Sequence, residues 1–445
     1  MELRDLIVTP LVIMLVYVIA YAVRPWLTDN TTRVYFFPAL TLKIFGALAL
    51  GFIYQFYYSG GDTFNYHTHG SRHIWEAFAD SPDKGLKLLF ASGSELPPEG
   101  TYSYASKILF FYDPSSYFVI KIAGVFDLIT FSSYSATAVL FAVFSFFGMW
   151  LFFLAFYADF PHLHRWLAVA AFFIPSVFFW GSGLLKDTIT LGCLAGLTYS
   201  IRKLFIEKRI SVKHIALLLV CIYIIFGIKK YILLCFLPAV LLWVFAGNFL
   251  RIRSVVLKIM LVPFMILLVV VSGYYSVIKI GEGDSRYALD KIATTARITA
   301  YDIGFYSGKD AGSGYSLGEL DGTMSGMLKL GPQAVNVSLF RPYLWEVSNP
   351  LMLFSALESL ALLLLTIYTL YNARNRLFRA LGDPTILFCL AFSITFAFAV
   401  GVSTFNFGTL TRYKIPMLPF YLMALILILN YPKSERNDED VEITE

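Results

Sequence analysis

The residues best suited to chemistry form an acidic, histidine-containing stretch early in the chain, GGDTFNYHTHG at positions 60–70. Its two glycines allow a tight turn, and Asp62 follows them directly. A carboxylate at this place suits a general base that takes a proton from an attacking hydroxyl. The alternative is that Asp62 caps a helix beginning at Thr63, and the two roles are compatible.

Three histidines follow, at positions 67, 69 and 73. Metal ligation is the less favoured interpretation, because side chains two residues apart do not share a helix face. We expect Tyr66 and His67 to line a substrate pocket through hydrogen bonds. The sequence predicts no cofactor and no metal ligands, although a divalent ion at Asp62 stays open.

Charged residues beside long apolar runs are the next candidates. Lys186 and Asp187 end the stretch WGSGLLKD, and Lys229 and Lys230 separate two later apolar runs. Each lysine has a simple role available as a membrane anchor whose ammonium reaches the surface. The functional alternative is that these residues bind a substrate phosphate.

The last third of the chain supplies the remaining candidates. Arg341 suits bidentate phosphate binding, and Glu346 is its nearest pairing partner in sequence. Glu358 lies inside an apolar run, where a carboxylate marks either a functional site or a bond to a neighbouring helix. Arg412 and Lys414 open the final apolar run, whose prolines suit the first turn of a helix.

Apolar helices must position these side chains. Of the 445 residues, 58% are hydrophobic and only 15% are charged, whereas soluble domains carry about 25% charged residues. The net charge is only +5, and the lysines and arginines cluster beside the apolar runs. This distribution gives no sign of nucleic-acid binding. We therefore expect an all-α, polytopic transmembrane bundle that forms a single integral membrane domain over 1–445.

Apolar windows predict about eleven spans. Their limits are 7–23, 37–56, 135–157, 165–182, 187–201, 213–228, 231–249, 254–277, 348–371, 384–403 and 413–431. Residues 116–131 are either an interfacial helix, which we prefer, or a twelfth span. The second choice would place Lys121 and Asp127 near the bilayer centre at a cost of several kcal/mol.

Lysine and arginine clusters orient the spans. Basic residues concentrate in 201–214, 251–258 and 374–379, which even numbers of spans separate. These loops are predicted to be cytoplasmic, together with the tail 432–445. The outer face of the plasma membrane then receives 58–134, with interfacial helices and the acidic motif, and 278–347, whose Gly and Ser content predicts a flexible loop.

Residues 61–67 of the acidic motif, GDTFNYH, and the entry to the final span, Arg412-Tyr413-Lys414-Ile415-Pro416, resemble the GT-C superfamily of polytopic glycosyltransferases. The resemblance covers the overall plan but only short stretches of sequence. It implies inverting transfer of a sugar from a polyprenyl-phosphate-linked donor to a glycan, lipid or protein acceptor in cell-surface glycan assembly. It also implies that Asp62 is the base and that Arg341 and Arg412 bind the donor phosphate.

The chain departs from that superfamily in two respects: it has an additional span before the acidic loop and no large C-terminal soluble domain. Other functions therefore stay open. A polysaccharide polymerase or ligase is similar in general plan and would use the same outer cations for a diphosphate. A transporter or flippase of a lipid-linked substrate would use Glu358, although the sequence shows no two related halves. A non-catalytic partner in a membrane assembly would not need Asp62.

Overall fold

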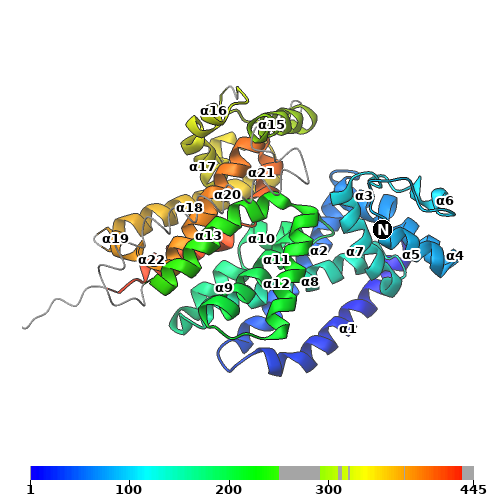
Figure 1. The fold of residues 1–445 in the computed structure, drawn as a ribbon, viewed down its shortest axis with the longest axis horizontal. Helices are drawn as coiled ribbons and strands as arrows, with labels where there is room; N and C mark the ends of the chain where they lie inside the picture. The colour runs from blue at the N-terminus through cyan, green and yellow to red at the C-terminus, as the bar shows by residue number, and fades with distance from the viewer. Residues whose placement is uncertain (1, 250–290, 309–312, 319–320, 375, 433–445) are drawn as a thin grey trace, which may run out of the picture.

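The computed structural model describes residues 2–249, 291–308, 313–318, 321–374 and 376–432. Within these ranges all regular structure is helical, apart from an isolated bridge between Gly314 and Asn406. The all-α prediction is therefore confirmed (Figure 1). The predicted span 254–277 and nearly all of the predicted tail 432–445 lie outside the described residues.

Several helices are long and apolar enough to cross a membrane, so this is a multi-pass membrane protein. The seven that qualify singly are α1 (Leu3–Leu27), α2 (Arg33–Phe56), α8 (Tyr134–Tyr157), α11 (Lys186–Ile201, extended by η3, Arg202–Ile206), α13 (Lys230–Phe249), α18 (Pro350–Ala373) and α20 (Pro384–Ser403). The pair α21 (Phe407–Tyr413) and α22 (Leu418–Leu429) bends by 67° and adds an eighth if it counts as one span.

Two of the predicted spans take a shorter form. The run predicted at 165–182 consists of α9 (His164–Phe172) and α10 (Pro175–Trp180). Ile174 between them is extended, because the residue before a proline disfavours the helical region. α12 (Val212–Ile228) is apolar but has only 17 residues. These breaks account for part of the difference from about eleven predicted spans.

α8 is the centre of the bundle and packs against α1, α2 and α11. A Cβ on Gly148 of α8 would collide with the backbone of Gly192 on α11, so small residues let these two helices approach closely. The starts of α8 and α11 face the same end of the bundle as Asp62, which we call the Asp62 end. At the opposite end, Arg202 after α11 bonds to Asp159 after α8.

The segment 58–134 folds into short helices at the Asp62 end (Figure 1). They are α3 (Asp62–Tyr66), η1 (His67–Ser71), α4 (Arg72–Asp80), α5 (Pro82–Phe90), α6 (Tyr102–Ala105) and α7 (Pro114–Thr130). Both ends of α7 reach this end of the bundle. Asp113 approaches Lys186 at the start of α11, and Thr130 bonds to Thr137 at the start of α8.

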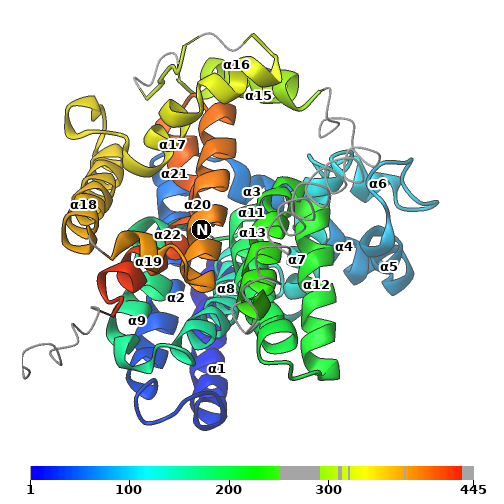
Figure 2. The same ribbon diagram turned by 60° about the vertical axis from the view of Figure 1, so that its left-hand side comes forward.

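Much of the described part of 278–347 is helical, which the prediction of a flexible loop did not anticipate. Its helices are α15 (Ile292–Gly308), α16 (Met324–Lys329), α17 (Gly331–Phe340) and η5 (Leu344–Glu346). α17 packs on α20, where the Ser338 hydroxyl donates to the Ala397 carbonyl at 2.7 Å. α15 and α16 lie across the end of α20 and α21 (Figure 2). The remaining short helices are η2 (Pro161–Leu163) and α19 (Leu377–Ala380).

Candidate functional site

Charged side chains from four parts of the chain meet at the Asp62 end. Arg412 on α21 donates from Nη1 to Asp62 Oδ2 at 2.6 Å and from Nε to Asp187 Oδ2 at 2.6 Å. The ammonium of Lys229, between α12 and α13, donates to the other oxygen of Asp187. We call Asp62, Asp187, Lys229 and Arg412 the charged cluster. Asp62 and Arg412 are 350 positions apart in sequence, so only the fold brings them together.

The two carboxylates of the charged cluster differ in exposure. The Asp187 side chain is 0% exposed, whereas that of Asp62 is 42% exposed. A buried carboxylate is tolerated when it is fully paired, and Asp187 is held by both Lys229 and Arg412. Asp187 therefore anchors the two cations, while Asp62 faces the solvent side, where a reacting group has access.

Lys186 lies beside the charged cluster, and its contact with a carboxylate, that of Asp113, is longer than those within the cluster. Its ammonium donates to the Ser115 hydroxyl at 2.7 Å and lies 3.5 Å from Asp113 Oδ2, which is long for a charge-assisted bond. Burial alone would raise the pKa of Asp113. The Lys186 ammonium and the hydrogen bonds from Ser116 and Ser115 outweigh it and hold that pKa below its ordinary value. Lys186 is thus well placed to accept a second anion.

Glycine conformations place Asp62 at the start of α3. Gly60 and Gly61 have φ of 134° and 123°, a region that favours glycine. A Cβ on Gly61 would also come within 2.8 Å of the Tyr54 ring. Gly61 is the N-cap and Asp62 is the first helical residue, so the interpretation of Asp62 as the cap of a helix starting at Thr63 is wrong.

Lys43 on α2 supports the turn that leads into Lys186. Its ammonium is buried and donates to the Gly181 carbonyl at 2.7 Å and to the Ser145 hydroxyl at 3.1 Å. A lysine inside a membrane helix is costly without such partners. Lys43 was not among the candidates from the sequence, because one cation barely lowers the mean hydropathy of an apolar window. Its charge inside the predicted span was the available signal.

Tyr66 and His67 occupy different surroundings. Tyr66 is buried, and burial together with the negative charge of Asp62 raises its pKa. His67 is also buried, but its Nε2 lies 3.5 Å from Asp127 of α7. The structure therefore places His67 against Asp127 and outside the charged cluster. Among the described residues, no group of three or more His, Cys, Asp or Glu could hold a metal ion.

Arg341 and Lys414 belong to a second polar group. Arg341 Nε donates to both carboxylate oxygens of Glu346, at 3.1 and 3.0 Å, and its guanidinium faces the Phe407 ring. Lys414 is buried and donates to the Ser359 hydroxyl at 3.1 Å. Both cations are thus engaged within the protein.

The remaining candidates are Glu358 on α18 and Lys230, which follows Lys229 of the charged cluster directly. Glu358 accepts hydrogen bonds from the backbone N–H and the hydroxyl of Ser176, at 2.8 and 2.7 Å. It therefore joins α18 to α10, which was the structural alternative for this residue. The Lys230 ammonium lies 5.1 Å from the centre of the Phe226 ring.

No protein-family model, curated protein or solved structure matches this chain. The resemblance to GT-C enzymes therefore rests on residues 61–67 and 412–416 and on the general plan. Because folds host many functions, a function has to be argued from the site itself. Here that site is the charged cluster together with Lys186, at the Asp62 end of a multi-pass membrane bundle.

Proposed function

We propose that this protein is a membrane glycosyltransferase that transfers a sugar from a polyprenyl-phosphate-linked donor to an acceptor hydroxyl in cell-surface glycan assembly. One observation carries the proposal. A solvent-facing carboxylate, Asp62, is fixed 2.6 Å from a guanidinium, Arg412, and two further cations, Lys186 and Lys229, belong to the same site. We interpret this arrangement as a base beside a set of cations suited to a phosphate.

The proposed reaction follows from the base and the cations. Asp62 takes the proton of the acceptor hydroxyl, and the acceptor oxygen forms a bond to the anomeric carbon. The bond between that carbon and the phosphate oxygen breaks, and its electron pair leaves with the lipid phosphate. Positive groups aimed at the leaving oxygens stabilise this charge as it develops. Attack opposite the leaving group inverts the anomeric centre.

The three cations differ in how firmly a carboxylate of the protein holds them, and therefore in how easily they can turn toward a phosphate. Arg412 and Lys229 are held by Asp187, so they provide a fixed positive field without losing side-chain entropy on binding. Lys186 has the longest carboxylate contact of the three and can turn toward a phosphate oxygen. We therefore assign first contact with the donor phosphate to Lys186, and stabilisation of the leaving group to Arg412 as well.

The distribution of charge supports a site facing outward from the plasma membrane. Arg202, Lys203 and Arg209 lie at the end of the bundle opposite Asp62. Arg376 after α18 bonds to the Tyr431 carbonyl after α22. Basic residues of this kind favour the cytoplasmic side, which leaves the Asp62 end outside.

The test is Asp62→Asn, which keeps the shape of the side chain but removes the base. Membranes with the variant are assayed with polyprenyl-phosphate and polyprenyl-diphosphate sugars, and surface glycans are compared in cells. Loss of a general base lowers the rate by about 10²–10⁴-fold. Asp83→Asn is the matched control, because Asp83 is an exposed carboxylate in the same segment that pairs with Lys87.

Three outcomes separate the proposals. A protein that is present at a normal level but inactive as Asp62→Asn supports the transferase. Activity retained with monophosphate donors removes Asp62 as the base. Turnover confined to diphosphate-linked oligosaccharides would favour a polymerase or ligase at the same site.

A further inference from the structure

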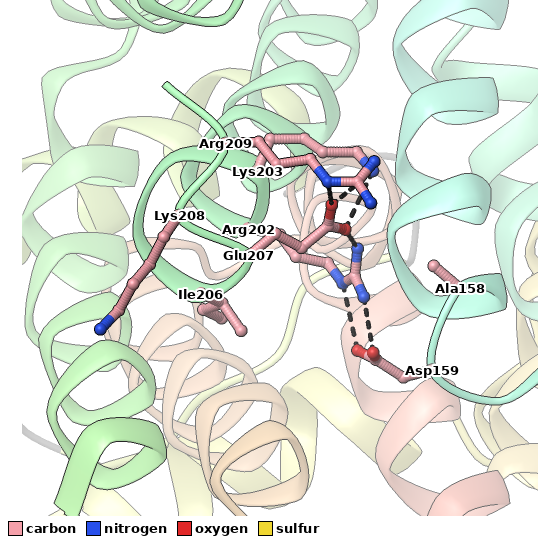
Figure 3. A pocket seen from close by; sticks show the side chains of 8 residues that line it. All are labelled: Ala158, Asp159, Arg202, Lys203, Ile206, Glu207, Lys208 and Arg209. Atoms are coloured by element: carbon pink, nitrogen blue, oxygen red, sulfur yellow. Dashed lines mark hydrogen bonds and ion pairs between the residues drawn. The ribbon is translucent and has the colours of Figure 1, made fainter. Parts of the chain in front are cut away.

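A second polar site lies at the end of the bundle opposite Asp62. A cavity of about 540 Å³ opens where α8 and η3 finish. We call it the basic cavity, and its charged walls are Asp159, Arg202, Lys203, Glu207, Lys208 and Arg209 (Figure 3). The four cations exceed the two acids, so the cavity carries excess positive charge that the proposed reaction does not use.

The inner wall of the basic cavity is a fixed ion-pair network. Arg202 is 4% exposed, and its Nε donates to Asp159 at 3.1 Å. Lys203 donates to both oxygens of Glu207 at 2.9 Å. These contacts neutralise the two acids and hold the end of η3 in one geometry, so the remaining charge belongs to Lys208 and Arg209.

Lys208 and Arg209 present that charge at the rim. Lys208 is exposed, has a φ of 57° and makes no ion pair in the described part of the chain. Arg209 is 75% exposed, and its Nε stays 3.4 Å from Glu207. In Figure 3 the Lys208 ammonium points away from both carboxylates. Arg209 thus keeps a long ion pair with Glu207, whereas Lys208 has no carboxylate partner among the described residues, and their charged ends lie apart in Figure 3. Together they leave the rim with a positive charge that attracts a phosphate.

Apolar side chains next to the rim indicate that the phosphate belongs to a lipid. Ile210 and Val212 are 81% and 82% exposed, directly after Arg209 and at the start of α12. Leu219 and Tyr223 continue this exposed surface along α12. A cavity of basic residues at the end of membrane helices is a typical site for an anionic headgroup, and the α12 surface would contact the acyl chains.

We infer that the basic cavity binds the phosphate headgroup of an anionic membrane lipid, with its acyl chains against α12. The chemistry required is a phosphate carrying one net negative charge and a hydrocarbon chain on the same molecule. The inference does not depend on the glycosyltransferase proposal, because the basic cavity and the charged cluster lie at opposite ends of the bundle.

The test uses the full-length protein in detergent and counts retained lipid by native mass spectrometry. The probes are phosphatidylglycerol, phosphatidylcholine and inorganic phosphate. The variant is Lys208→Gln/Arg209→Gln, whose side chains are both exposed and whose one ion pair among the described residues is the 3.4 Å contact of Arg209 with Glu207. A cation near an anionic headgroup changes affinity by about five-fold, so the variant should bind phosphatidylglycerol roughly 25-fold more weakly.

The matched control is Arg374→Gln/Arg379→Gln, which removes two exposed charges near the end of α18 but away from the basic cavity. It should change phosphatidylglycerol affinity by less than about two-fold. Equal binding of phosphatidylglycerol and phosphatidylcholine, or equal losses in the two double variants, would overturn the inference. Displacement of phosphatidylglycerol by millimolar inorganic phosphate would show a simple phosphate site and overturn the lipid assignment.

Discussion

At the scale of single residues, the burial of Asp187 separates its role from that of Asp62. Asp187→Asn removes the negative charge that Lys229 and Arg412 share inside the protein. Breaking a buried ion pair from one side costs about 3–5 kcal/mol. We expect a large drop in the thermal unfolding midpoint of the purified protein.

The same measurement on Asp62→Asn provides the comparison, because this side chain is 42% exposed and exposed pairs contribute at most about 1 kcal/mol. Equal destabilisation by the two variants would contradict the assignment of Asp187 as the buried anchor. A stable Asp62→Asn protein also makes its activity assay interpretable.

Asp113 gives a prediction for pH. Its folded pKa lies below the ordinary value of 3.8, so its stabilising contribution is complete above that value and is lost as the pH falls through the lower folded pKa. We compare unfolding midpoints of wild type and Asp113→Asn. The wild-type advantage should be constant near neutral pH and should close as the pH falls below the ordinary value of 3.8. A wild-type advantage that grows in acid would contradict the downward direction of the Asp113 pKa shift.

All four residues of the charged cluster, and Lys186 beside them, were candidates from the sequence, because charges beside apolar runs are costly and therefore noticeable. Their contacts with one another were not predicted. Asp113 was missed because it reads as an ordinary helix cap before Pro114, a role that it also performs. Its approach to Lys186 depends on packing 73 residues away, which no local pattern encodes.

At the scale of elements, the close contact between α8 and α11 holds the helix that begins with Lys186 and Asp187. Gly148→Ala would push a methyl group into the Gly192 backbone, and overpacking of this kind costs about 1–3 kcal/mol. Gly247→Ala on α13 is the control, because nothing lies within 4 Å of the added Cβ. Unfolding midpoints that fall equally in both variants would exclude close packing as the cause.

The long spans were predictable and the broken ones were not. α8 was predicted as 135–157 and spans Tyr134–Tyr157, because it is uniformly apolar. The mean hydropathy of a window cannot detect the break before Pro175 or the 67° bend between α21 and α22. Pro419 does open the first turn of α22, as predicted, whereas Pro416 lies in the turn before that helix.

At the scale of the whole molecule, orientation decides which substrates reach the charged cluster. The chain suits cysteine labelling, because Cys193, Cys221, Cys235 and Cys389 are all buried and give little background. We place single cysteines at Ser94, an exposed loop position in the segment that carries Asp62, and at Lys208 in the basic cavity. With an impermeant maleimide, Ser94→Cys should react in intact cells, and Lys208→Cys only after permeabilisation.

A third position tests whether α7 lies along the interface. Phe131 follows α7 and is 63% exposed. Because both ends of α7 reach the Asp62 end of the bundle, we expect Phe131→Cys to label from the same side as Ser94→Cys. Labelling from opposite sides would make α7 a span. If Ser94→Cys and Phe131→Cys both required permeabilisation, Asp62 would face the cytoplasm and the outward-facing transferase would be excluded, because its lipid-linked donor and acceptor would be on the other side of the membrane.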